Sequence, residues 1–145
     1  MAALDAVKPP IWFWIVALLA LAWEVMGCFA YVSQVGMSAA DIAKLPADQQ
    51  EIWQMMPGWV TGAYAVAVWI GLLGAIALVA RKSWARPLFI VSVVAAIAQF
   101  GWTFLATPIL KTMGASAALF PAVIILIGLL LVGYAGHATR RGWLS

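Results

Sequence analysis

Charged side chains are scarce in this sequence. Asp, Glu, Lys and Arg make up 9% of its 145 residues, whereas 66% are hydrophobic and the mean hydropathy is +1.04. Soluble domains carry roughly 25% charged residues, so the composition excludes an ordinary soluble domain and predicts an integral membrane protein. At this length we expect one domain that lies almost entirely in the lipid bilayer.

Several chemical groups that define other protein classes are missing. Cys28 is the only cysteine, so no intrachain disulfide can form, and His137 is the only histidine, which leaves no ligand set for a metal or haem. The net charge of +3 comes from residues at the ends of apolar segments rather than from a basic patch, so nucleic acid is not an expected partner. Glycine-rich phosphate loops, nucleophile elbows and zinc motifs are also absent. We therefore expect neither an enzyme nor a cofactor.

Four apolar segments are each long enough to cross a bilayer as an α-helix, which takes about 20 residues. They cover residues 11–35, 59–80, 87–107 and 119–139. Proline lies just before each segment or in its first turn, where a helix tolerates it. The predicted fold class is an all-α membrane protein, an antiparallel bundle of four transmembrane helices.

The one substantial hydrophilic stretch is residues 36–58. Ser38 followed by Asp41 resembles a capping box, with aspartate in place of the usual glutamate or glutamine. Pro46 then interrupts the segment, and residues 47–56 mix acidic and amide side chains with apolar and aromatic ones. We expect one or two short helices that lie on the membrane surface.

Basic residues are distributed unevenly between the two ends of the predicted bundle. One end would carry Lys8, Arg81, Lys82, Arg86, Arg140 and Arg141, and the other only Lys44 and Lys111. Cytoplasmic loops of membrane proteins are enriched in Lys and Arg. We therefore expect a multi-pass protein of the bacterial inner membrane with both termini cytoplasmic and residues 36–58 periplasmic.

The first apolar segment allows one alternative interpretation. Val25-Met26-Gly27-Cys28 resembles the cleavage box of a bacterial lipoprotein, which would make the first 28 residues a signal peptide. Met26 fits that box poorly, and Glu24 would interrupt the apolar region that a signal peptide needs. We therefore expect an ordinary first transmembrane helix.

Glu24 is the only acidic residue inside the four apolar segments. An ionised carboxylate is costly in hydrocarbon, so such a residue generally faces the protein interior or a water pocket and has a partner. With a rise of ~1.5 Å per residue, Glu24 lies about 20 Å from the inner edge of a ~30 Å hydrocarbon core. Gln99 lies at nearly the same depth, so we expect the two side chains to form a hydrogen bond across the bundle.

Other polar and aromatic side chains are expected near Glu24. Tyr64 and Thr103 would lie somewhat closer to the outer face, and Trp69 and Trp102 lie near mid-depth, where interfacial belts do not place tryptophan. The predicted substrate- or proton-binding residues are Glu24, Gln99, Tyr64, Thr103, Trp69 and Trp102. They would form a pocket open toward the outer half of the membrane, in which Glu24 exchanges a proton or binds a cation between aromatic walls. The structural alternative is that Glu24 only joins the first and third helices.

Small residues recur at four-residue spacing in the second apolar segment, at Ala63, Ala67, Gly71 and Ala75. Such a stripe allows another helix to approach closely. A single four-helix chain is too thin to enclose a large alternating-access pathway, so a transporter would have to be a homo-oligomer or part of a larger membrane complex. The stripe is the candidate interface.

Two sets of motifs resemble known families. Trp12-Phe13-Trp14, Trp23-Glu24-x-x-Gly27, Leu45-Pro46-x-x-x-Gln50, Pro57-x-Trp59-Val60 and Arg81-Lys82-x-Trp84-Ala85 resemble a family of small bacterial four-helix inner-membrane proteins often labelled as sugar transporters. Ala22-x-Glu24-Val25-Met26-Gly27 resembles the first-helix proton and drug site of the small multidrug resistance family, and Gly62-Ala63-Tyr64-Ala65 with Trp69-x-Gly71 resembles its third helix. In this sequence the latter segment is the second helix, and that family's first-helix lysine is missing.

Two functions remain as hypotheses. The first is proton-coupled transport of a small solute by an oligomer with Glu24 as the intramembrane ionisable site. The second is a non-catalytic accessory subunit that packs against and stabilises a larger membrane complex. A solute-dependent proton flux that is lost in Glu24→Gln would favour the first, and copurification with a large complex without flux would favour the second.

Overall fold

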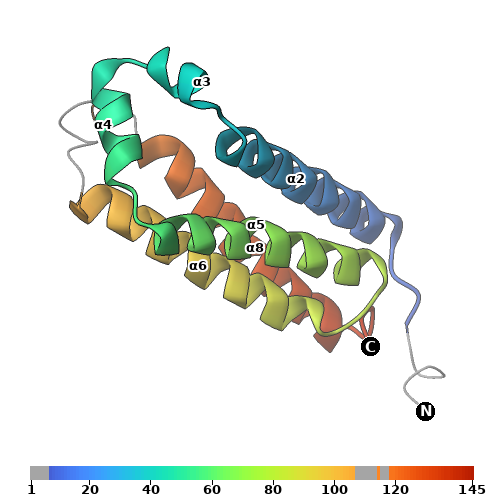
Figure 1. Ribbon diagram of the computed structural model, residues 1–145. Coiled ribbons are helices and arrows are strands. Elements are labelled where there is room, and N and C mark those ends of the chain that lie inside the picture. Colours follow the sequence, from blue (N-terminus) through green and yellow to red (C-terminus); the bar gives the residue numbers. More distant parts are fainter. Residues whose placement is uncertain (1–6, 107–113, 115–117) are drawn as a thin grey trace.

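The computed structural model describes residues 7–106, 114 and 118–145. Four long helices form an antiparallel bundle: α2 (Ile11–Val35), α5 (Gly58–Val79), α6 (Ala85–Ala106) and α8 (Leu119–Arg140) (Figure 1). Each is long and apolar enough to cross a membrane, and no β-strand occurs among the described residues. The predicted fold class, an all-α bundle of four transmembrane helices, is therefore confirmed.

The long helices begin and end within two residues of the boundaries expected from hydropathy. The largest difference is at the start of α6, which begins at Ala85 and includes Pro87 in its first turn, where proline is tolerated. Thr107, the expected last residue of this segment, lies outside the described residues. So do Lys111 and most of the connection expected at residues 108–118.

Two short helices, α3 (Ala39–Ala43) and α4 (Ala47–Met55), lie at one end of the bundle (Figure 1). The capping box predicted for Ser38 and Asp41 is confirmed. The backbone N–H of Asp41 donates to Ser38 Oγ at 3.2 Å, and the backbone N–H of Ser38 donates to Asp41 Oδ2 at 3.2 Å. Gln50 Nε2 then donates to Leu45 O at 2.7 Å, which ties α4 to the turn before it.

The apolar core is concentrated at the opposite end of the bundle. Its buried members come from the four long helices and the C-terminal segment: Phe13, Ala17, Ala20, Ala75, Ala77, Leu78, Ala85, Phe89, Leu131, Ala135, Ala138, Trp143 and Leu144. Aromatic rings meet edge to face there, as rings prefer. The ring centroids of Phe13 and Trp14 are 5.1 Å apart, as are those of Trp12 and Trp143. Small residues between the rings let the helices approach closely, so this end of the bundle is densely filled.

Helices α5 and α8 both end in a Schellman turn, in which a left-handed residue allows two backbone hydrogen bonds back into the helix. Gly142 takes the left-handed position after α8, with φ 79°. After α5 the position is taken by Arg81, with φ 62°. The backbone N–H of Arg81 donates to Leu78 O at 3.0 Å, and that of Lys82 donates to Ala77 O at 2.8 Å. A side chain makes left-handed backbone costly by about 1–2 kcal/mol, so Arg81 requires a compensating interaction.

The Arg81 side chain supplies that interaction. Its Nη2 donates to Val7 O at 2.9 Å, and its Nε donates to Trp143 O at 2.9 Å. The backbone N–H of Ser145 donates to Arg81 O at 3.0 Å, and that of Val7 donates to Gly142 O at 3.2 Å. We call this set of contacts the Arg81 clasp. It joins the segment before α2, the α5–α6 turn and the segment after α8, so both ends of the described chain lie at the same end of the bundle.

The small-residue stripe of α5 is buried within the chain except at Ala63, which is half-buried. Ala75 is 0% exposed, Ala67 and Gly71 are also buried, and α5 packs closely against both α2 and α6. The expectation that this stripe forms an interface between copies is therefore wrong. Its small side chains instead allow the neighbouring helices of the same chain to approach.

Candidate functional site

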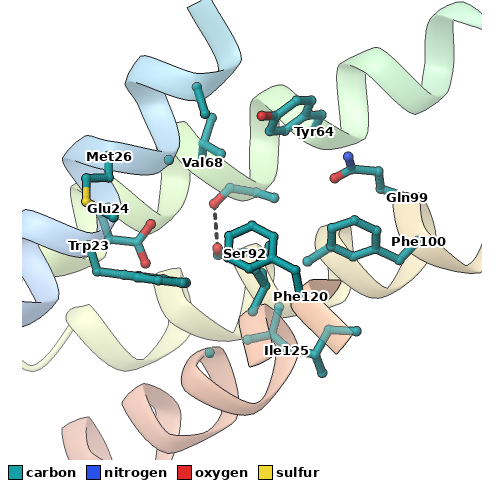
Figure 2. Close-up of a pocket in the computed structure, with 17 residues that line it drawn as sticks. Trp23, Glu24, Met26, Tyr64, Val68, Ser92, Gln99, Phe100, Phe120 and Ile125 are labelled. Carbon is teal, nitrogen blue, oxygen red and sulfur yellow. Dashed lines mark hydrogen bonds between the residues drawn. The ribbon is translucent and has the colours of Figure 1, made fainter. Parts of the chain in front are cut away.

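A pocket of about 230 Å³ lies inside the bundle, beyond the densely filled end. All four long helices contribute to its wall (Figure 2). Most lining side chains are apolar or aromatic, and the hydrogen-bonding side chains among them that carry oxygen are Glu24, Tyr64, Ser92 and Gln99. The pocket can therefore hold a largely apolar molecule that carries a few polar groups.

Helical periodicity positions Glu24 in this wall. The buried positions of α2 are Phe13, Ala17, Ala20, Glu24 and Cys28, which recur every three or four residues along one face. That face packs against α5, and Glu24 is 9% exposed. Four residues further along, Cys28 Sγ donates to Val68 O of α5 at 3.3 Å. The helix that carries Glu24 is thus held against α5 one turn beyond the carboxyl group.

Gly71 of α5 provides the space that the Glu24 carboxyl group occupies. A Cβ added to Gly71 would lie 2.8 Å from Glu24 Cδ and 2.9 Å from Ser92 Oγ, and closer still to Glu24 Oε2. Real Cβ atoms do not approach other atoms so closely, so only glycine fits here without a shift. Glu24 of α2, Gly71 of α5 and Ser92 of α6 therefore lie next to one another at the same level of the bundle.

Ser92 joins α6 to α5 at this level. Its Oγ donates to Ala67 O at 2.5 Å (Figure 2). This bond uses the only hydroxyl proton, so toward the pocket Ser92 can act only as an acceptor. Ser92 was not among the predicted site residues. The available signal was its position as the one hydroxyl residue in the first half of the third apolar segment.

The predicted hydrogen bond between Glu24 and Gln99 is not formed. Among the described residues, no hydrogen bond or ion pair involves the Glu24 carboxyl group, and Gln99 lies two turns beyond Ser92 on α6, about 10 Å along the helix. The predicted depths were residue counts from the start of each helix, which are comparable only if the first and third helices start at the same depth. The long helices instead cross at an angle, and α2 is displaced along the bundle relative to α6 (Figure 1), so equal residue counts do not give equal depths.

Three of the six predicted site residues line the same pocket. Glu24 lies toward one end, and Tyr64 and Gln99 lie toward the other end, beyond Ser92 (Figure 2). The rings of Tyr64 and Tyr31 meet edge to face, with centroids 5.1 Å apart. The pocket therefore has an ionisable group at one end and a phenol and an amide at the other.

The other three predicted residues are not part of the pocket lining. Thr103 Oγ1 donates to Gln99 O one turn back on α6, at 3.1 Å. Trp69 lies on the outside of α5, where it is 41% exposed and its ring contacts Tyr31. Trp102 is half-buried and does not line the pocket. These positions were selected by depth alone, which does not tell which side of a helix faces inward.

Different aromatic residues form the pocket wall, namely Trp23, Phe100 and Phe120. The rings of Trp23 on α2 and Phe120 on α8 approach each other, with centroids 6.4 Å apart. Helices α2 and α8 are not among the extensively packed pairs, which are α2–α5, α5–α6 and α6–α8. Between α2 and α8 the pocket wall is therefore formed by contact between the side chains of Trp23 and Phe120, and not by close packing of the two helix backbones.

No group of three or more His, Cys, Asp or Glu residues in the described ranges is placed to hold a metal ion. The chemistry of the pocket is thus that of one carboxyl group, an amide, a phenol and aromatic rings. Comparisons with protein-family models, with characterised proteins and with solved structures find no match to this chain.

Proposed function

We propose that this protein is a small transporter of the bacterial inner membrane that binds a largely apolar solute in the central pocket and exchanges a proton at Glu24. One observation carries the proposal. The only acidic residue of the four long helices is 9% exposed in the wall of a pocket that all four helices line. Intramembrane carboxyl groups are costly and typically serve proton or substrate pathways.

The size and lining of the pocket favour a particular class of solute. An apolar cavity of ~150 Å³ accommodates benzene, so a pocket of about 230 Å³ fits a molecule roughly the size of two fused rings. A sugar needs a polar partner for each of its hydroxyl groups, and this lining offers few. We therefore favour a small aromatic or aliphatic solute with one or two polar groups over a sugar.

Proton coupling follows from having a single carboxyl group at one end of the pocket. Glu24 can hold a proton, or it can accept a hydrogen bond from a donor group of the solute. Because the two compete for the same oxygen atoms, solute binding and proton binding are linked, and each weakens the other by the same factor. The orientation that we propose places the Arg81 clasp and the basic end of the bundle in the cytoplasm.

Binding of 2-naphthol, a two-ring compound with one hydroxyl group, tests the pocket. Its fluorescence can be followed as it is titrated into purified protein in neutral detergent. We expect saturable binding that weakens about tenfold in Glu24→Gln, since hydrogen bonds to charged groups contribute about 1.5–3 kcal/mol. Glu51→Gln is the matched control, because this substitution removes the same charge from an exposed residue of α4. Equal binding by Glu24→Gln and the unmodified protein would contradict the proposal.

Proton flux tests transport itself. Protein is reconstituted into liposomes that contain a pH-sensitive dye, and gradients of small aromatic and aliphatic compounds are applied, with protein-free liposomes as the blank. At least one compound is expected to drive proton movement in the unmodified protein and in Glu51→Gln, but not in Glu24→Gln. Absence of any compound-dependent flux beyond the blank would rule out proton-coupled transport of these solutes.

A second candidate function is that of an accessory subunit in a larger membrane complex. The one long helix that α2 packs against extensively is α5, so much of its apolar surface faces outward, with Phe29 75% exposed. This face can contact lipid or another membrane protein. Reproducible copurification with a large complex in mild detergent, without proton flux, would favour this function over transport.

A further inference from the structure

Two arginine side chains from different helices converge at the basic end of the bundle. Arg86 is the second residue of α6, and Arg140 is the last residue of α8. Both approach Gly136 of α8. A Cβ added to Gly136 would lie 3.2 Å from Arg86 Nε and 3.4 Å from Arg140 Nη1. The absence of a side chain at Gly136 thus allows two guanidinium groups to occupy the same small volume.

This convergence is not explained by an acidic partner. Among the described residues, neither arginine side chain forms an ion pair or a hydrogen bond. Glu24 is in the central pocket, whereas Asp41 and Glu51 lie on α3 and α4 at the other end. Two cations brought together without an anion repel each other, so the arrangement is suited to a negatively charged group from outside the described chain.

The setting of the pair indicates what kind of anion fits. Both arginines lie at the ends of membrane-length helices, which is the level of lipid headgroups. One turn into the membrane from Arg86, Ile90 is 41% exposed and offers an apolar surface to an acyl chain. Trp84, in the turn just before α6, is exposed and is of the type that anchors at the membrane interface.

We propose that Arg86 and Arg140 together bind a phosphate group, supplied by the headgroup of an anionic phospholipid in the adjacent leaflet. Guanidinium groups match phosphate oxygens through paired N–H donors, and basic sites between transmembrane helices recognise anionic headgroups. Arg81 is not part of this site because its Nε and Nη2 are used by the clasp.

Lipid binding to the purified full-length protein in neutral detergent tests the site. Phosphatidylglycerol is titrated and the bound lipid is counted by native mass spectrometry. Arg86→Gln and Arg140→Gln are each expected to weaken binding about tenfold. Arg141→Gln is the matched control, since it removes the same charge from an exposed residue at the same end, and at most a twofold change is expected there.

Two further variants separate geometry from charge. Gly136→Ala leaves the net charge unchanged but places a methyl group against both guanidinium groups, so binding is expected to weaken severalfold. Arg86→Lys keeps the charge and loses the planar pair of donors, so it should bind more weakly than the unmodified protein and more tightly than Arg86→Gln. An equal loss in Arg141→Gln, Arg86→Gln and Arg140→Gln, with no effect of Gly136→Ala, would overturn the site in favour of diffuse surface charge.

Phosphatidylcholine and inorganic phosphate identify the source of the phosphate. The expected result is tight binding of phosphatidylglycerol, weak binding of phosphatidylcholine, and displacement of the lipid by inorganic phosphate only at millimolar concentration. If inorganic phosphate binds as tightly as phosphatidylglycerol and depends on the same two arginines, the phosphate site stands but the lipid source is wrong. If neither binds, the proposal fails entirely.

Discussion

Individual polar side chains in this bundle are accommodated by a glycine that faces them. Gly71 leaves room for Glu24 and Ser92, and Gly136 leaves room for two arginine side chains. In each case the atoms nearest to an added β-carbon belong to polar side chains, at colliding distance for Gly71 and in tight contact at 3.2–3.5 Å for Gly136. These glycines therefore determine where a polar or charged side chain from a neighbouring position can lie against the helix, in addition to allowing close packing.

Gly71→Ala tests this role at the central pocket. The added methyl group must displace the Glu24 carboxyl group or separate α5 from α2 and α6, so we expect a loss of about 1–3 kcal/mol in the free energy of unfolding. 2-Naphthol binding should fall as well. Unfolding can be followed by circular dichroism during titration with a denaturing detergent.

Gly62→Ala is the matched control on the same helix. A Cβ at Gly62 would meet no other atom within 4 Å, so the substitution should be neutral or stabilise the helix by up to about 1 kcal/mol. Similar destabilisation by the two substitutions would show that the contact with Glu24 is not the cause.

Arg81→Gly separates the two contributions of Arg81. Glycine removes the cost of the left-handed backbone, about 1–2 kcal/mol, but it also removes two hydrogen bonds from a charged donor, worth about 1.5–3 kcal/mol each. We therefore expect a net loss of about 1–5 kcal/mol in the same unfolding measurement. The neighbouring Lys82→Ala, at an exposed position, should change little. A more stable Arg81→Gly variant would mean that the clasp does not offset the backbone cost.

At the scale of elements, the helices pack in the order α2, α5, α6 and α8, with the closest pairs consecutive along this series. Small residues occur at each of these contacts. On α8, a Cβ at Gly128 would lie 2.5 Å from Val93 Cγ2 of α6, whereas a Cβ at Gly133 would meet nothing within 4 Å. The same substitution at the two sites should therefore have different consequences.

Gly128→Ala is expected to destabilise the α6–α8 contact by about 1–3 kcal/mol, and Gly133→Ala to be neutral or slightly stabilising. Adding Val93→Ala removes the colliding methyl groups, so the double variant should recover part of the loss caused by Gly128→Ala. This recovery appears as a coupling energy in a double-mutant cycle. Strictly additive effects of the two substitutions would contradict direct contact between these residues.

At the scale of the whole molecule, the proposed orientation has a direct test. Single cysteines are introduced by Ser38→Cys and Ser145→Cys in a Cys28→Ala background, since both serines are exposed at opposite ends of the bundle. With both termini cytoplasmic, a membrane-impermeant maleimide added to intact cells with a permeable outer membrane should label residue 38 and not residue 145. The reverse labelling pattern would invert the proposed orientation.

The architecture could be predicted from the sequence because the four segments are almost uniformly apolar and are separated by polar or proline-containing stretches. The capping box of Ser38 could be predicted because its partners are three residues apart. Contacts between helices were harder to predict. The depth of Gln99 relative to Glu24 depends on how far α2 and α6 are offset and on the angle at which they cross. Whether Trp69 and Trp102 face inward depends on how each helix is rotated about its axis. A nearly uniform hydropathy encodes neither.

The central pocket was predicted in outline, with Glu24, Tyr64 and Gln99 in its wall. Ser92, Trp23 and Phe120 were missed because the sequence does not tell which side of each helix faces inward, although the hydroxyl group of Ser92 stands out in its apolar segment. Arg81 was missed for another reason, because its hydrogen-bond acceptors are backbone carbonyls of Val7 and Trp143. Any residue can supply a carbonyl group, so no sequence pattern marks such a partner.

The Arg81 clasp also has a consequence for biogenesis. It joins three segments that leave the ribosome at different times, with Trp143 emerging some sixty residues after Arg81. The clasp can therefore close only after α8 has entered the membrane beside α6. Until then Arg81 lacks its acceptor on Trp143, and the backbone N–H of Val7 lacks its acceptor on Gly142. Closure of the clasp thus distinguishes a chain whose four long helices are all in place from one whose last helix is still to be inserted.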